Sequence, residues 1–125
     1  MILIDAIEEN SRIAIELFAN FQDDTLTYDE ESVAKLDYFI EQKREVFNRD
    51  TIDRMVQVFG SFLGQCIRRN YGGEWDEIGE GIGVRFDEKN GVFPFGKVRK
   101  QFENGPEDSI LSLYQMIPMV FKNLK

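Results

Sequence analysis

The sequence contains no histidine and only one cysteine, Cys66. Without histidine there can be no Ser-His-Asp triad, no Cys-His pair, no His-ligated zinc and no imidazole acting as a general acid or base. A single cysteine excludes an internal disulfide and a metal site built from several thiolates, so nothing indicates a secreted, disulfide-stabilised protein. These absences remove the commonest catalytic and metal-binding arrangements.

Long apolar segments are missing as well. No stretch approaches the roughly 18–20 residues of a membrane span. The first residues, MILID, lack the basic segment of a signal peptide. We therefore expect a cytoplasmic protein that does not bind membranes. The chain has 125 residues, of which 42% are apolar and 30% charged, and this composition suits a single globular domain spanning residues 1–125.

Charge is distributed unevenly along the chain. The net charge is −8; residues 1–50 contain thirteen acidic and five basic residues, whereas residues 51–125 contain ten of each. The whole net charge therefore belongs to the first fifty residues. Because binding to nucleic-acid phosphates needs clustered lysine and arginine, this acidic surplus argues against a nucleic-acid partner.

Acidic residues are dense in two segments, residues 23–31 and residues 74–80. One interpretation is a solvated surface that keeps the protein soluble. The other is a negative patch that attracts a basic partner and speeds association, with Tyr28, Tyr38 or Trp75 as an aromatic anchor. In this second interpretation the partner is contacted by Asp23, Asp24, Tyr28, Asp29, Glu30, Glu31, Glu74, Asp76, Glu77 and Glu80.

Apolar residues at helical spacing predict three helices, at residues 5–21, 30–47 and 51–71. The apolar positions of the first helix extend to Phe21. Asp29 or Thr27 is expected to cap the second helix, and Asn48 or Asp50 to cap the third.

The third of these helices has the widest apolar band and is expected to be the central one. Gly72 and Gly73 should end it. Gly60 and Gly64 lie inside it, although each glycine costs about 1 kcal/mol relative to alanine in a helix. They are four residues apart on one edge of the apolar band, so we expect a groove in which another segment of backbone approaches closely.

After the third helix the apolar residues alternate, which is typical of half-buried strands. Asn90 and Gly91 should supply the positive φ angles of a hairpin loop, and Pro94 should lie at the edge or the end of a strand. The predicted elements are a strand at 82–86, a loop at 87–91, a strand at 92–95 and a further strand around Trp75.

Two helices complete the expected fold, one at residues 96–104 and one that begins at Pro106. Gly105 should separate them. Pro118 should kink or restart the last helix, because proline cannot donate to the carbonyl of Tyr114. Three helices, a small antiparallel sheet of two or three strands and two C-terminal helices together indicate the α+β class.

The sequence offers no constellation of activated catalytic groups. Cys66 lies on the apolar face of the third helix, which favours a buried, inert thiol. Residues 23–31 lack the spacing of an EF-hand loop, and the glycines at 79, 81 and 83 do not open a helix as a phosphate-binding loop does. The basic cluster at residues 97–100 should pair with acids of the same fold. We expect no enzyme activity, no metal and no cofactor.

Residues 60–75 read GSFLGQCIRRNYGGEW, and this segment resembles a group of small bacterial proteins with a G-x-[FY]-[LF]-G helix followed by G-G-x-W. The segments PFGKV at 94–98 and GPEDSI at 105–110 resemble the group's P-F-x-x-V and G-x-x-x-S-[IL] segments. The resemblance covers about residues 51–115. Where the group often has glutamate after the second helical glycine, this chain has Gln65.

Proteins of that group are encoded beside polymorphic toxins, including contact-dependent growth-inhibition systems, and are taken to be immunity proteins. The resemblance implies that the motif glycines are architectural and that Trp75 anchors the core. It also implies a protein partner, a cognate toxin domain. The acidic first half favours a basic toxin, such as a nuclease, on which it would mimic or displace nucleic acid. Two alternatives remain, a housekeeping or assembly domain whose acidity serves only solubility, and an enzyme or small-ligand binder that uses carboxylates.

Overall fold

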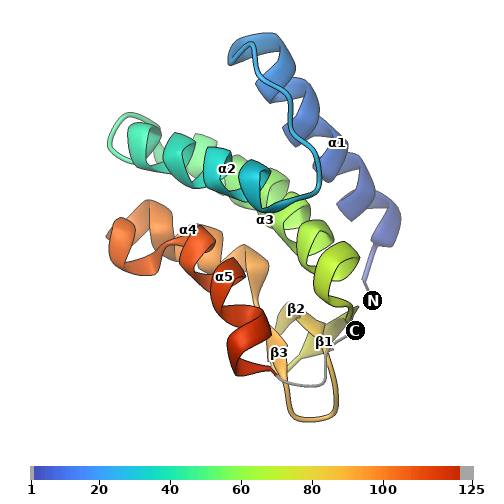
Figure 1. Cartoon of the computed structure of the whole chain (residues 1–125). Coiled ribbons are helices and arrows are strands. Elements are labelled where there is room, and N and C mark those ends of the chain that lie inside the picture. Colours follow the sequence, from blue (N-terminus) through green and yellow to red (C-terminus); the bar gives the residue numbers. More distant parts are fainter. Residues whose placement is uncertain (1, 122–125) are drawn as a thin grey trace.

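The computed structural model describes residues 2–121 and confirms the α+β class (Figure 1). Three helices precede a small antiparallel sheet with the strand order β1-β2-β3, and two helices follow it. The elements are α1 (Ile4–Phe21), α2 (Glu30–Lys43), α3 (Arg49–Tyr71), β1 (Glu74–Ile78), β2 (Gly81–Arg85), β3 (Gly91–Val92), α4 (Pro94–Asn104), a 3₁₀ turn (Pro106–Asp108) and α5 (Ile110–Val120).

Helix α3 is the central element, as its apolar band predicts. Every residue from Val58 to Ile67 is buried, and α1 and α4 both pack along the helix. In Figure 1 the sheet lies beside the C-terminal end of α3, and α4 and α5 lie together on the same side of α2 and α3. Gly72 and Gly73 end the helix with φ angles of 91° and 94°, which residues other than glycine rarely adopt.

Two glycines of α3 allow close packing against other segments, one against backbone and the other against an aromatic ring. A Cβ at Gly60 would stand 2.9 Å from the Cα of Phe95, so the backbone at the start of α4 does approach here. At Gly64 the neighbour is the indole ring of Trp75 instead of a backbone segment. Gln65 accepts a hydrogen bond from the indole N–H at 3.2 Å, and Trp75 is buried, as expected of a core anchor.

The starts of α2 and α3 are each fixed by a side-chain cap. Asp29 accepts a hydrogen bond from the backbone N–H of Ser32 at 2.9 Å at the start of α2, and Asn48 accepts from Thr51 at 2.8 Å at the start of α3. Both residues belong to the predicted pairs of candidates, and each satisfies an N–H that has no partner within its own helix.

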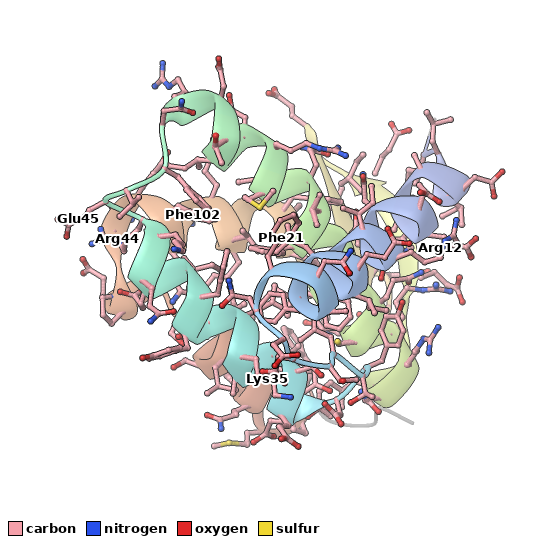
Figure 2. All side chains as sticks on the ribbon, turned by 90° about the horizontal axis from the view of Figure 1, so that it is seen from above. Arg12, Phe21, Lys35, Arg44, Glu45 and Phe102 are labelled. Carbon is pink, nitrogen blue, oxygen red and sulfur yellow. The ribbon has the colours of Figure 1, made fainter. Side chains whose placement is uncertain are left out.

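Helix α2 ends at Lys43, so the predicted helix over residues 30–47 is four residues too long. Asn48 must adopt an extended conformation to cap α3, and the chain therefore turns beforehand. Arg44 follows the helix and donates to the backbone carbonyl of Glu103 at 3.0 Å. Figure 2 shows Arg44 next to α4, where Phe102 lies. Phe47 still packs on the core from the turn.

The predicted strand at 92–95 is shorter than expected, because β3 ends at Val92 and Pro94 opens α4. Proline fits this position because the first turn of a helix needs no N–H from it. Asn90 and Gly91 do not adopt positive φ angles. Instead, the carboxylate of Asp87 accepts hydrogen bonds from the backbone N–H groups of residues 89 and 90 and forms the turn.

The last helix begins at Ile110 and not at Pro106. Pro106 opens a 3₁₀ turn, and the hydroxyl of Ser109 then caps α5 by accepting from the N–H of Ser112 at 3.1 Å. Pro118 neither ends nor restarts the helix, which runs on to Val120. Its position in the last turn explains this, because few hydrogen bonds of the helix lie beyond it.

One predicted apolar position of α1 lies outside the core. Phe21 is 79% exposed, whereas Phe18, one turn earlier, is buried against Phe39 and Phe59. Figure 2 shows Phe21 at the end of α1, where the helix gives way to the following loop. The apolar pattern in the sequence therefore extends one position beyond the residues of α1 that are buried.

Candidate functional site

The two acidic segments both contact the last turn of α3. Arg69 lies over the ring of Tyr28, 3.6 Å from its centroid, and Asn70 donates to the backbone carbonyl of Tyr28 at 2.8 Å. Arg68 pairs with Glu74 at 3.3 Å. Tyr28, in the middle of the first segment, and Glu74, the first residue of β1, are thus brought to the same end of the central helix.

Part of the first segment serves the fold itself. Lys35 pairs with Asp24 at 2.9 Å, and this hydrogen bond, together with one from the N–H of Thr25, lowers the pKa of the Asp24 carboxyl. The hydrogen bond from Ser32 and a second one from Thr27 lower the pKa of the capping Asp29. Asp24 and Asp29 are therefore less available to a partner than their position in the sequence suggests.

The remaining carboxylates of the first segment point into solvent. Asp23 is exposed and adopts a φ of 50° in the turn after α1. Glu30 and Glu31 are exposed in the first turn of α2; Glu30 contacts Gln115 at 3.2 Å, and Glu31 is 3.9 Å from Lys35. Asp23, Glu30 and Glu31 are the acids of this segment with the most accessible charge.

The second acidic segment follows β1 away from α3. Arg85 pairs with Asp76 at 2.7 Å, and this hydrogen bond lowers the pKa of the Asp76 carboxyl. Glu77 is exposed on the same strand. Glu80 lies in the turn between β1 and β2, where it lines a hollow described below. The structure therefore joins only the beginning of this segment to residues 23–31.

The three candidate aromatic anchors have different surroundings. Tyr38 is 67% exposed on α2. Tyr28 is half-buried: its ring stacks on Phe62, and its hydroxyl is 2.9 Å from that of Ser11. Trp75 is buried and belongs to the core. Of these three, Tyr38 is directly accessible to a partner, whereas Arg69 covers the outer face of Tyr28.

Two further acids of the first half hold the helices together, which the sequence did not indicate. Asp37 accepts hydrogen bonds from the hydroxyl of Ser109 at 2.5 Å and from the N–H of Leu111 at 3.1 Å, so it ties α2 to the start of α5. Glu41 accepts from Gln101 at 2.8 Å. Their sequence signal is indistinguishable from that of solvated acids on a helix.

The basic cluster of α4 pairs within the fold at two of its three positions. Lys97 is 3.2 Å from Asp108, and Arg99 is 2.9 Å from Asp53. Lys100 has no ion pair among residues 2–121. The expected internal pairing is therefore confirmed for Lys97 and Arg99, while Lys100 acts on Asp108 only through its charge, which helps to lower the pKa of that carboxyl.

Cys66 and Tyr114, two groups that could act as nucleophiles, are buried. Burial raises the pKa of the Cys66 thiol, which disfavours the reactive thiolate. Burial likewise raises the pKa of the Tyr114 phenol, and its oxygen accepts a hydrogen bond from Asn70 at 2.8 Å. Among residues 2–121 no group of three or more acids and cysteines is placed to hold a metal ion. No helix in this part of the chain has both the length and the apolar character of a membrane span.

A hollow of about 960 Å³ lies between the first half of α1, the middle of α3, the hairpin, the first half of α4 and the side of α5 that carries Leu113 and Met116. Its wall is largely apolar. Ser61 on α3 lines it, and the hydroxyl of this residue is fully buried without a hydrogen-bond partner. The sequence did not reveal this site, because Ser61 reads as an ordinary small residue of a helix. The sequence signal that could have pointed to this region is Phe93-Pro94, because phenylalanine before the first residue of α4 cannot cap the helix with its side chain.

Comparison of the chain with protein-family models, with curated proteins and with solved structures found no match.

Proposed function

We propose that the chain is a non-catalytic, cytoplasmic immunity protein that binds and neutralises a cognate toxin domain with a basic surface, such as that of a nuclease. The proposal rests on the placement of charge. Tyr28 in the first segment and Glu74 in the second contact the last turn of α3, and Glu30 and Glu31, just after Tyr28, are exposed to solvent. Asp23 adds a further exposed carboxylate in the turn after α1. A concentrated negative surface attracts a basic partner and suppresses association with acidic ones.

The cations near this surface reduce its charge only in part. Lys35 lies between Asp24 and Glu31, and Arg68 is paired with Glu74. Arg69 stacks on Tyr28 and remains exposed. A partner that displaces the arginine from the tyrosine ring would gain a flat aromatic contact, and aromatic contacts of this kind often carry much of the energy of a protein interface.

The chemistry of the described residues supports binding rather than catalysis. The thiol of Cys66 is buried, and the carboxylates with lowered pKa values are paired with cations or with N–H groups. Groups held in this way are poor general acids and nucleophiles, because catalysis needs an accessible group whose pKa lies near the working pH.

The test measures how fast and how tightly this chain binds the toxin domain encoded beside it. Biolayer interferometry at 50 and 500 mM salt gives both quantities. We expect tight binding with an association rate that falls by roughly tenfold or more as salt screens the surface charges. Cells that express the toxin domain should survive when this chain is also expressed. A chain that neither binds nor protects is not an immunity protein for that toxin.

The location of the surface is tested by removing three exposed charges with near-isosteric substitutions, Asp23→Asn, Glu30→Gln and Glu31→Gln. We expect this triple variant to bind more slowly and more weakly while it unfolds at a similar denaturant concentration. The matched control is Glu103→Gln with Glu107→Gln, two exposed acids on and after α4. If the control and the triple variant weaken binding equally, the interface is not at residues 23–31.

A further inference from the structure

The chain contains two Asn-Gly dipeptides, Asn90-Gly91 and Asn104-Gly105. Asparagine before glycine is especially prone to deamidation, because glycine has no side chain that keeps its backbone nitrogen away from the asparagine amide. The reacting groups are neighbours in the chain, so each dipeptide is a candidate modification site. Which of them reacts in the folded protein depends on how the fold holds the two groups.

Deamidation joins the backbone nitrogen of the glycine to Cγ, the side-chain carbonyl carbon of the asparagine. The nitrogen loses its proton to a base in the solvent and attacks Cγ; the bond from Cγ to Nδ2 breaks, and Nδ2 takes up a proton and leaves as ammonia. Water then opens the resulting succinimide ring at either carbonyl carbon and gives aspartate or isoaspartate. Water is the only co-reactant, and the reaction requires a glycine N–H that is free to lose its proton.

The side chains of the two asparagines are held in the same way. Nδ2 of Asn90 donates to both carboxylate oxygens of Asp87, at 3.0 and 2.9 Å, and Nδ2 of Asn104 donates to Asp108 at 2.8 Å. Each carboxylate restrains the amide group that would leave as ammonia, so this contact does not distinguish the sites. Side-chain exposure favours the second site, because Asn104 is exposed and Asn90 is half-buried.

The glycine N–H of the second site is already engaged in a hydrogen bond. Gly105 follows the last residue of α4, and its N–H donates to the carbonyl of Gln101 at 2.9 Å. The residue is also buried beneath Arg44: a Cβ at position 105 would stand 3.2 Å from Cζ of the guanidinium group. A nitrogen that donates to a carbonyl is protected from losing its proton until that bond opens. The end of α4 therefore blocks the nucleophile of Asn104-Gly105.

The N–H of Gly91 lies at the open edge of the sheet instead. The N–H of Phe86 donates to the carbonyl of Asn90 at 2.8 Å, and Gly91 lies opposite Arg85 in the next pair of the ladder. Because hydrogen-bonded and non-hydrogen-bonded pairs alternate between antiparallel strands, the N–H of Gly91 points away from β2. On that side no strand pairs with β3 among residues 2–121. The nucleophile of this dipeptide is therefore available.

We propose that Asn90 is the deamidation site of the folded protein and that the end of α4 protects Asn104. The β2–β3 loop extends beyond the sheet in Figure 1, and residues 87–89 are exposed, so base and water have access. The aspartate product would place a second carboxylate against Asp87, and like charges at hydrogen-bonding distance repel each other. Deamidation should therefore weaken the hairpin. This modification goes beyond the proposed toxin binding and does not depend on it.

The test follows both sites while the native chain is incubated at mildly alkaline pH, beside a second sample in denaturant. Peptide mapping by mass spectrometry in acidic solution, which suppresses further reaction, gives the deamidated fraction at each asparagine. In the native chain we expect Asn90 to react about fivefold or more faster than Asn104, because one hydrogen bond holds the second nucleophile. In denaturant both should react at similar rates, because unfolding removes the bond to Gly105.

Two matched variants locate the reaction in the intact protein. Asn90→Gln should remove most of the acidic species that ion exchange detects in the aged native chain, because the longer side chain closes a ring far more slowly. Asn104→Gln should leave that species unchanged. Equal rates at the two dipeptides of the native chain, or faster reaction at Asn104, would overturn the proposal in favour of side-chain exposure. It also fails if Asn90 reacts only in denaturant, since the β2–β3 loop would then protect it.

Discussion

The indole ring of Trp75 lies directly against the backbone of Gly64, so closely that a Cβ at residue 64 would overlap the ring. The ring belongs to the first strand after α3, and its N–H reaches Gln65 on the same helix. Glycine in the interior of a helix costs stability, and here that cost is offset by the close packing of the largest side chain of the protein.

We therefore predict that Gly64→Ala lowers the free energy of unfolding by about 2–3 kcal/mol, because the rigid indole cannot move away without leaving its pocket. Chemical denaturation followed by Trp75 fluorescence measures the change. Gly96→Ala is the matched control, since a Cβ there would meet its nearest atom at 3.8 Å, an ordinary contact. This second variant should be as stable as the native chain or more stable, by up to about 1 kcal/mol. Equal losses in both variants would contradict the packing explanation.

Two buried serines should respond in opposite directions to the loss of their hydroxyls. Ser11 is hydrogen-bonded to Tyr28 at 2.9 Å, whereas Ser61 has no partner. Ser61→Ala should raise the free energy of unfolding by about 1 kcal/mol and Ser11→Ala should lower it by a similar amount. Thermal unfolding of the two variants checks this, and a lower Tm for Ser61→Ala would show that its hydroxyl is satisfied.

Stability should fall in acid. The pKa of Asp29 is lowered by its hydrogen bonds from Ser32 and Thr27, and that of Asp24 by its bond from Lys35. A carboxyl whose pKa is lower in the folded state stabilises the fold above its unfolded pKa, near 3.8, and this contribution is lost as pH falls through the folded pKa. Denaturant midpoints should therefore drop steadily below about pH 4.

The same measurement has an internal control in Asp29→Asn. Asparagine still caps a helix, so the variant should resemble the native chain at pH 7. It carries no titrating group at this position, and its midpoint should consequently fall less steeply in acid. If both chains lose stability with the same slope, the capping carboxylate does not contribute to the acid sensitivity.

Gln101 should be the polar residue of α4 that tolerates substitution least. It is fully buried; its side-chain carbonyl accepts from the N–H of Ile110 at 2.8 Å, and its amide donates to Glu41. Gln101→Met keeps the approximate volume but leaves the N–H of Ile110 unsatisfied, and we expect a loss of about 1–3 kcal/mol in unfolding experiments. The neighbouring Glu103→Met, at an exposed position, should change stability by less than about 0.5 kcal/mol.

Cys66 should be inert in the folded protein. Burial excludes reagents and raises the pKa of the thiol. A thiol-specific reagent at pH 8 should react slowly with the native chain and within seconds to minutes after unfolding in denaturant. Fast reaction of the native chain would indicate frequent opening around α3.

The order and class of the elements could be predicted because they depend on local patterns. The apolar period of 3.6 in residues 51–71, the alternation at 82–86 and the glycines at 72–73 each reflect a requirement of nearby backbone. The caps at Asp29 and Asn48 are equally local, since each side chain reaches only three residues ahead. The predicted core of α3 follows for the same reason.

Other features depend on contacts between distant segments, and no local pattern predicts those. The turn after α2 is held by Arg44, which donates to the carbonyl of Glu103 on α4, and the start of α4 packs through Phe95 on Gly60. Asp37 serves the start of α5 through hydrogen bonds across more than seventy residues. An acid that accepts such a bond and an acid in solvent look alike in the sequence.

The sequence by itself determined the sign of the net charge, its position in the first fifty residues and the absence of imidazole chemistry. These depend only on which residue types occur and in what order. Which carboxylates remain free was decided by folding, which gave Asp24 a lysine and Asp29 a helix start. Folding also created the hollow and left the buried hydroxyl of Ser61 without a hydrogen-bond partner. Cavities and unsatisfied groups arise from the mutual placement of whole elements, and tertiary packing sets that placement.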